Sequence, residues 1–146
     1  MKAQRSATYQ RVWFITGSSA GLGRALTEAV LARGERAVVT ARTPERVRDL
    51  IERYPAQALV LELDVSRPDQ VRSVVREAME RFGHIDVLAN MDGFSAVLSQ
   101  EVAPLGIKVI TIEPGCPNGH PPNDVSARAD AIIAAVDADS VRSAIR

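Results

Sequence analysis

A glycine-rich segment near the start of the chain has the residue types that could hold a phosphate group. The segment Thr16–Gly23 follows the apolar residues 12–15 directly and leads into a helix-like pattern. Its glycines allow a sharp strand-to-helix turn and bring main-chain N–H groups close to an anion. The positive end of the helix dipole favours a pyrophosphate there. We therefore predict a dinucleotide-binding turn, the alternative being a purely structural turn.

The predicted contacts in this turn come from backbone and short side chains. They are Gly17, Ser18, Ser19, Gly21, Leu22 and Gly23.

Arg42 could also have a chemical role, because it lies at the end of the second predicted strand, just after the apolar run 37–40. In a dinucleotide-binding sheet, an acidic residue at this place accepts hydrogen bonds from a free ribose 2′-hydroxyl, whereas a guanidinium suits a 2′-phosphate. No Asp or Glu lies between Arg36 and Pro44. We expect NADP(H) rather than NAD(H), with Arg46 as another phosphate partner. The alternative for Arg42 is a solvated surface charge.

Asp64 closes a third apolar run, 58–63, at the expected carboxyl edge of the sheet. Its carboxylate could accept a hydrogen bond from the amino group of adenine. A turn or capping role is the alternative, because Asp64 stands two residues before Ser66, which we expect to cap the next helix.

A second set of reactive residue types lies near the end of the chain. Cys116, His120 and Asp124 follow one another at spacings of four. They fall in and beside a proline-rich segment, 114–123, which we expect to be a loop, where helical spacing has no meaning. We therefore predict no metal site and no nucleophile there.

The elements that must position these residues alternate along the chain. Short apolar runs predict strands at 12–15, 37–40, 58–63, 85–89 and 107–112. Amphipathic segments between them predict helices that begin near 22, 44 and 66, and further helices over 94–102 and 124–136. Continuous apolarity is typical of parallel strands covered on both faces. The alternation predicts an α/β fold with a doubly wound parallel sheet and helices on both faces.

Composition sets limits on partners. The chain has 146 residues and no net charge, so we expect one domain over 1–146 and no nucleic acid or membrane partner. Its single cysteine fits a reducing compartment. Residues 1–10 are polar, without the apolar centre of a secretion signal, and we expect them to be disordered. No apolar run approaches the roughly 20 residues of a membrane span. We expect a cytoplasmic protein.

Together these features resemble the short-chain dehydrogenase/reductase family. The turn Thr16–Gly23 is similar to the family's Thr-Gly-x-x-x-Gly-x-Gly motif. Asp64-Val65 resembles its adenine-contacting pair, so the resemblance implies that Val65 also contacts the cofactor. The late segment 102–109, followed by Pro114-Gly115, resembles the family's helix–strand–Pro-Gly segment. The fold implied is Rossmann-like.

One departure from the family lies at residues 90–93. The run 83–88 resembles the approach to the family's Asn-Asn-Ala-Gly motif, but Asn90-Met91-Asp92-Gly93 follows it. The resemblance implies cofactor contacts from Asn90 and Gly93. If Asp92 pointed inward, like-charge repulsion would weaken the binding of the cofactor. If it capped the next helix instead, the loss of binding would be slight.

The other departure concerns catalysis. Family members carry a helix, a strand with the catalytic Ser and a Tyr-x-x-x-Lys pair between that motif and the late helix. Here only residues 94–100 separate the two landmarks, and neither Tyr9 nor Tyr54 is followed by Lys four positions later. The tyrosine hydroxyl is the family's proton donor. We therefore assign no catalytic residue.

Three functional hypotheses follow. The first is an NADP(H)-binding scaffold, minimised by nature or by design, without hydride transfer. The second is a residual NADP(H)-dependent oxidoreductase that uses water or another acid on a carbonyl or alcohol. The third is a structural module that has lost the cofactor. In each, we expect five strands in the order 3-2-1-4-5, with 107–112 beside 85–89, and an apolar edge that favours a homodimer.

Overall fold

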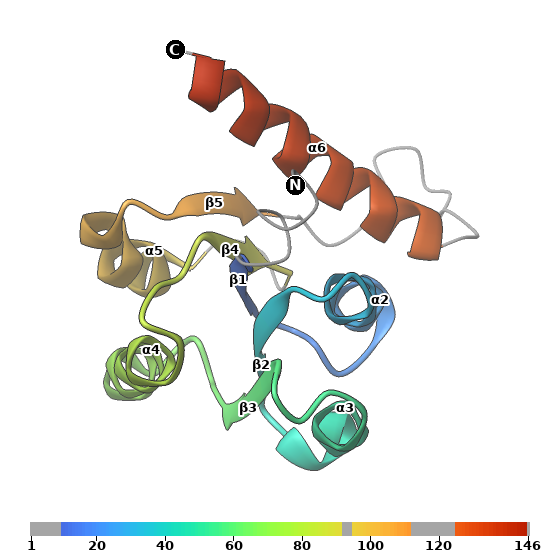
Figure 1. Ribbon diagram of the computed structural model, residues 1–146. Helices are drawn as coiled ribbons and strands as arrows, with labels where there is room; N and C mark the ends of the chain where they lie inside the picture. Colours follow the sequence, from blue (N-terminus) through green and yellow to red (C-terminus); the bar gives the residue numbers. More distant parts are fainter. Residues whose placement is uncertain (1–9, 92–94, 112–124, 146) are drawn as a thin grey trace, which may run out of the picture.

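The computed structural model describes residues 10–91, 95–111 and 125–145, and its centre is one parallel sheet (Figure 1). The five strands lie in the order β3-β2-β1-β4-β5, and every neighbouring pair is parallel. This confirms the predicted order. The strands are β1 (Val12–Ile15), β2 (Arg36–Ala41), β3 (Ala58–Glu62), β4 (Val87–Asn90) and β5 (Lys108–Thr111).

Helices cover both faces of the sheet, as predicted. Figure 1 shows α2, α3 and α6 on one face and α4 and α5 on the other. The bounds are α2 (Gly21–Ala32), α3 (Arg48–Arg53), α4 (Pro68–Phe82), α5 (Ala96–Val102) and α6 (Val125–Ile145). Two short 3₁₀ turns, Pro44–Val47 and Ala103–Leu105, stand before α3 and after α5.

Several element ends differ from the sequence prediction. Ser66 does not cap α4, because its hydroxyl donates to Asp64 Oδ1 (2.6 Å) and the helix begins at Pro68. Helix α5 begins at Ala96, since Ser95 caps it by accepting from Leu98 N–H (3.3 Å). The last helix runs on to Ile145, because no Gly or Pro interrupts it.

Some predictions fall where the structure gives no description. The expected disorder at 1–10 lies outside the described residues except for Gln10, and so does the expected loop 114–123.

The central strand β1 explains the continuous apolar runs. Trp13 and Ile15 pack on the side of α2, α3 and α6, whereas Val12 and Phe14 pack on the side of α4 and α5. All four side chains are fully buried. Both faces of the strand are therefore core, which is why it shows no polar alternation.

Strand β5 is the last strand of the sheet on its side. It pairs with β4 from Val87↔Lys108 to Asn90↔Thr111, which confirms the expected place of the segment 107–112. Within the described ranges no strand pairs with its other edge. Val109 is 43% exposed there.

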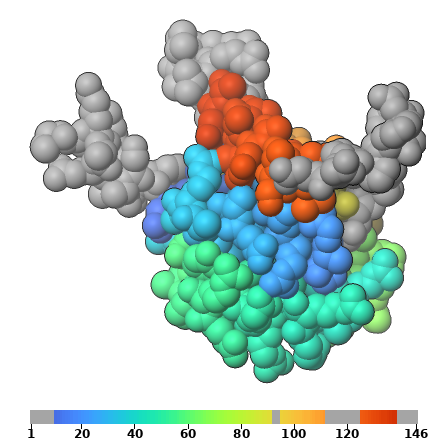
Figure 2. All heavy atoms as spheres, turned by 90° about the vertical axis from the view of Figure 1, so that its right-hand side faces the viewer, coloured from blue at the N-terminus to red at the C-terminus, as the bar shows by residue number. Residues whose placement is uncertain are grey.

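Helix α6 is held to the body by apolar packing and by charges. Its buried residues Ala129, Ile133 and Val136 belong to the core cluster on the α2 side. Figure 2 shows the orange-red surface of α6 lying over the blue surface of α2. Farther along the helix, Asp137 accepts hydrogen bonds from Arg11 (2.5 Å) and Arg33 (3.1 Å).

Glu35 is the centre of this charged cluster. It accepts from Arg11 Nε (2.6 Å) and from the indole N–H of Trp13 (2.9 Å). Its side chain is only 12% exposed, and that of Arg11 only 16%. A charge buried to this degree requires its partners, so Glu35 should contribute more than an ordinary surface ion pair.

We predict that Glu35→Ala lowers the free energy of unfolding by about 2–4 kcal/mol, because the buried indole N–H and the Arg11 guanidinium both lose an acceptor. Urea denaturation followed by the fluorescence of Trp13, the only tryptophan, measures this directly. The exposed Glu77 on α4 gives the control, Glu77→Ala, which should stay within about 0.5 kcal/mol. Equal effects of the two substitutions would contradict the role given to Glu35.

Candidate nucleotide site

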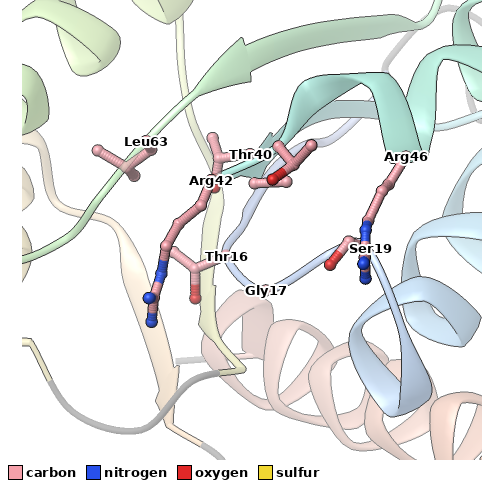
Figure 3. A pocket seen from close by; sticks show the side chains of 9 residues that line it. Thr16, Gly17, Ser19, Thr40, Arg42, Arg46 and Leu63 are labelled. Atoms are coloured by element: carbon pink, nitrogen blue, oxygen red, sulfur yellow. The ribbon is translucent and has the colours of Figure 1, made fainter.

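A cavity of about 280 Å³ lies at the carboxyl ends of β1 and β2, between the glycine-rich turn and the start of the 3₁₀ turn (Figure 3). Ligands of open α/β sheets bind at this edge. Its lining combines small polar side chains with two arginines: Thr16, Gly17, Ser19, Thr40, Ala41, Arg42, Thr43, Arg46 and Leu63.

The glycine-rich turn is built on a very close contact between its ends. A Cβ added at Gly23 would lie 1.9 Å from the carbonyl oxygen of Gly17. Gly17 itself has a φ of 63°, in the left-handed region that favours glycine. The first turn of α2 can therefore pack directly against the end of β1. The free N–H groups of the helix then point toward the glycine-rich turn.

Ser18 serves the backbone of this turn. Its side chain is fully buried, and its hydroxyl donates to the carbonyl of Ile15 (3.1 Å). Its N–H donates to the carbonyl of Thr40 (3.3 Å), which ties the turn to the end of β2. Ser19, by contrast, lines the cavity.

The start of α2 has no internal cap. Ala20 at the N-cap position provides no side-chain hydrogen bond, and the first turn of α2 contains no acidic residue. Anions are stabilised near such a helix start by its N–H groups and dipole. This end of the helix is therefore suited to a phosphate.

Thr16 links the glycine-rich turn to β4. Its N–H donates to the carbonyl of Ala89 (3.1 Å), and its hydroxyl accepts from the N–H of Met91 (3.0 Å). The ends of the two neighbouring strands are thus fixed relative to one another on the side where the chain order reverses.

Asn90 occupies the end of β4 and is 1% exposed. Its amide nitrogen donates to the hydroxyl of Thr111 on β5 (3.4 Å). Its Oδ1 has no hydrogen-bond partner within the described part of the chain. Asn90 therefore joins the last two strands. Asp92 and Gly93 lie outside the described residues, so their predicted effects on the cofactor stay predictions.

Arg42 and Arg46 provide positive charge to the cavity. Both side chains are exposed, and Figure 3 shows the Arg42 guanidinium beside Thr16 and the Arg46 side chain beside Ser19, on either side of Gly17 in this view. Neither guanidinium has a carboxylate within ion-pair distance among residues 10–91, 95–111 and 125–145. Two such cations beside a helix start can bind an anionic group through charge-assisted hydrogen bonds.

Asp64 takes part in a turn, which was the alternative to its adenine role. Its Oδ1 accepts from the hydroxyl (2.6 Å) and the N–H (3.0 Å) of Ser66. These two hydrogen bonds hold the pKa of Asp64 below its usual range, and the charges of Arg42 and Arg67 act in the same direction. The carboxylate is therefore ionised at neutral pH. An adenine contact by Asp64 or by the half-buried Val65 stays a prediction.

The cavity thus brings together Gly17, Ser19 and Arg42 from the predicted set, and with them Arg46, which was predicted as another phosphate partner. The other predicted residues within the described ranges do not line it: Ser18, Gly21, Leu22, Gly23, Asp64, Val65 and Asn90. Sequence reasoning did not select Thr40, Thr43 or Leu63, although each ends or follows a predicted strand. Their position at the carboxyl edge of the sheet could have indicated that they line the site.

Residues 10–91, 95–111 and 125–145 contain no group of three His, Cys, Asp or Glu side chains that could hold a metal ion. Cys116, His120 and Asp124 lie outside them, and the prediction of no metal site there stays untested. None of the described helices combines the length and the apolarity that a bilayer crossing needs.

We predict that Gly23→Ala destabilises the fold by about 1–3 kcal/mol or more, the cost of overpacking, although alanine normally favours a helix. The added methyl group would overlap the Gly17 carbonyl. Thermal unfolding measures the effect. Gly34→Ala is the comparison, since a Cβ there meets no atom within 4 Å and only the φ of 90° opposes it. A milder effect at Gly23 than at Gly34 would contradict the close contact.

Comparison with known proteins agrees with this architecture. The family model for short chain dehydrogenases matches residues 11–91. The oxidoreductase BOA17 of Botryotinia fuckeliana is 39% identical over 92 residues, which are 62% of this chain and 34% of that protein. The chain spans about a third of the length of the curated relatives it matches, at 34%, 28% and 35% for three of them.

Solved structures share the fold. A short-chain dehydrogenase from Streptomyces avermitilis has a TM-score of 0.74 at 24% identity, covering 88% of this chain and 85% of its own. A short chain dehydrogenase/reductase from Burkholderia phymatum, solved in complex with NAD, has a TM-score of 0.64 at 20% identity, covering 94% and 62%. Because the family match extends over residues 11–91 of the 146, the chain belongs to the short chain dehydrogenase family.

Proposed function

We propose that this chain binds NADP(H) at the glycine-rich turn and the adjoining cavity, and that it does not carry out the hydride transfer of its family. NADP(H) binding is supported above all by two exposed guanidinium groups, those of Arg42 and Arg46, which line a cavity at the end of β2. They stand where a dinucleotide-binding sheet places the residues that read the adenosine ribose.

The turn and the cavity would bind different parts of the dinucleotide. The uncapped start of α2 would hold the pyrophosphate through its N–H groups. Arg42 and Arg46 would hold a 2′-phosphate through charge-assisted hydrogen bonds. When bound, the nicotinamide could supply or accept a hydride. The Burkholderia phymatum neighbour was solved in complex with NAD, which supports a dinucleotide as the ligand.

The choice of NADP(H) over NAD(H) rests on charge. The segment that lines the cavity from β2, Thr40–Thr43, contains an arginine and no carboxylate. A free 2′-hydroxyl would find no acidic acceptor there. A 2′-phosphate would meet two positive charges.

The proposed loss of hydride transfer rests on what separates β4 from β5. The chain passes from Asn90 to α5 within five residues, 91–95, and β5 follows as the next strand. No Tyr-x-x-x-Lys pair occurs in the given sequence, so the family's proton donor, a tyrosine hydroxyl acidified by that lysine, is not present in it. Turnover of NADPH with a simple carbonyl would instead support the alternative, a residual oxidoreductase.

We predict that NADPH stabilises the protein more than NADH does, and that Arg42→Asp weakens NADPH binding by about 10- to 100-fold, the loss of one or two charged hydrogen bonds. Thermal shift and nicotinamide fluorescence measure both, because a ligand of the folded state raises its stability. NADH binding should change much less.

Arg72→Asp is the matched control, because it makes the same charge change at an exposed position on α4, away from the cavity. It should leave the NADPH preference intact. If neither nucleotide stabilised the protein at millimolar concentration, the proposal would be contradicted. Only the third hypothesis, a structural module without cofactor, would then remain.

We also propose that two copies of the chain pair through β5. Among the described residues no strand lies beyond β5 in the sheet, and Val109 on this strand is 43% exposed. Exposed strand edges of this kind promote pairing with another chain. The partner would then be a second copy in a symmetric arrangement.

We predict that Val109→Lys shifts the protein from dimer to monomer in sedimentation experiments, because a charge on the edge strand opposes pairing. Ile51→Lys, on the exposed side of α3, is the control and should leave the dimer unchanged. A wild-type protein that sediments as a monomer at high concentration would contradict the pairing.

A further inference from the structure

Arg24 lies outside the cavity but is bonded to the segment that supplies one of its cations. It stands in the first part of α2, one residue after Gly23. Its Nη1 donates to the main-chain carbonyl of Arg46 (3.0 Å), and its Nη2 donates to Asp49 Oδ2 (2.5 Å). A second carboxylate contact, with Glu28, is longer at 3.4 Å.

We propose that Arg24 is a positioning residue for the 2′-phosphate: it fixes the 3₁₀ turn Pro44–Val47 so that Arg46 faces the cavity. The proposal rests on the NADP(H) function proposed above, and gives it a specificity-determining residue that makes no contact with the cavity. Arg24 would act through Arg46 alone.

Val47 anchors the end of the turn that carries Arg46, because its side chain is fully buried in the core, but the start of the turn has few hydrogen bonds. Thr43 stands at its N-cap position without a side-chain hydrogen bond. The backbone bond from Arg46 N–H to the Thr43 carbonyl (3.1 Å) is the bond of a single tight turn. Such turns have poorer hydrogen-bond geometry than an α-helix. The bond from Arg24 holds the carbonyl of Arg46 itself, so it restrains the backbone from which that side chain extends.

Fixing this backbone in advance favours phosphate binding. A long side chain on a mobile turn loses more conformational freedom when it binds than one on a fixed turn. Arg24 also links the two halves of the proposed site, because α2 begins at the pyrophosphate turn and Arg46 lies on the adenosine side. The guanidinium of Arg24 thus helps to set the distance between them, together with the pairing of β1 and β2.

Arg24 has a second, electrostatic effect on the same place. Asp49 lies three residues after Arg46, and its carboxylate would repel a phosphate if it were uncompensated. The hydrogen bond from Arg24 holds the pKa of Asp49 below its usual range, with smaller support from the charges of Arg24 and Arg53. The carboxylate is thus ionised at neutral pH and directed to Arg24 instead of the cavity.

Arg53 offers a close control. Its Nη1 contacts the same two carboxylates, Glu28 at 3.3 Å and Asp49 at 3.9 Å. No bond joins it to Arg46 in the described structure, and it does not line the cavity. Arg24→Met and Arg53→Met therefore remove the same charge from the same cluster, but only the first frees the turn.

The test compares two probes that differ in the 2′-phosphate, adenosine 2′,5′-bisphosphate and 5′-AMP, by calorimetric titration. For Arg24→Met we expect affinity for the bisphosphate to fall by about 3- to 10-fold, from the cost of ordering one or two side chains. Affinity for 5′-AMP should change less than about 2-fold, within the ordinary effect of a distant surface substitution. Arg53→Met should leave both affinities unchanged.

The ratio of the two affinities is the informative quantity, because partial unfolding of a variant lowers both equally. A ratio unchanged by Arg24→Met, or lowered equally by Arg53→Met, would overturn the positioning role while leaving NADP(H) binding in place. A wild-type protein without preference for the bisphosphate would instead overturn the proposed function, and the positioning role with it.

Discussion

The contact between Gly23 and the carbonyl of Gly17 is the constraint on which the site depends. A Cβ at position 23 would lie 1.9 Å from that oxygen, so no other residue fits without moving the helix. The contact fixes where α2 begins relative to β1. From this one placement follow the direction of the helix N–H groups and the reach of Arg24 to the 3₁₀ turn. The cavity lies between these two features.

The two arginines at the cavity differ in their partners from four others of the described residues. Arg11, Arg24, Arg33 and Arg53 pair with carboxylates and join helices to the sheet or to each other. Arg42 and Arg46 have no such pairing in the described ranges and face the cavity (Figure 3). In a chain without net charge, two exposed cations that line one cavity indicate an anionic ligand better than the total charge does.

Sequence reasoning predicted the sheet order and the turn because both depend on local patterns. Fully buried strands such as β1 read as continuous apolar runs, and the glycine spacing follows from the close approach of α2. It failed where a side chain had a choice of partners. Ser66 bonds to Asp64 instead of capping α4. No spacing in the sequence indicates that Ser18 bonds to the Ile15 carbonyl either, and its cofactor contact stays a prediction. The role of Arg24 depends on the distance to Arg46 across 22 positions, and only the fold sets that distance.

The central claim is that the nucleotide site is retained and the hydride chemistry is not. The most direct measurement is a single-turnover experiment in which protein in excess over NADPH is mixed with a simple aldehyde or ketone. Nicotinamide fluorescence reports binding, and nicotinamide absorbance reports oxidation in the same sample. We predict a fluorescence change on binding, and no loss of nicotinamide absorbance beyond the loss seen for NADPH without the protein. Loss of absorbance that requires the folded protein and the carbonyl would contradict it.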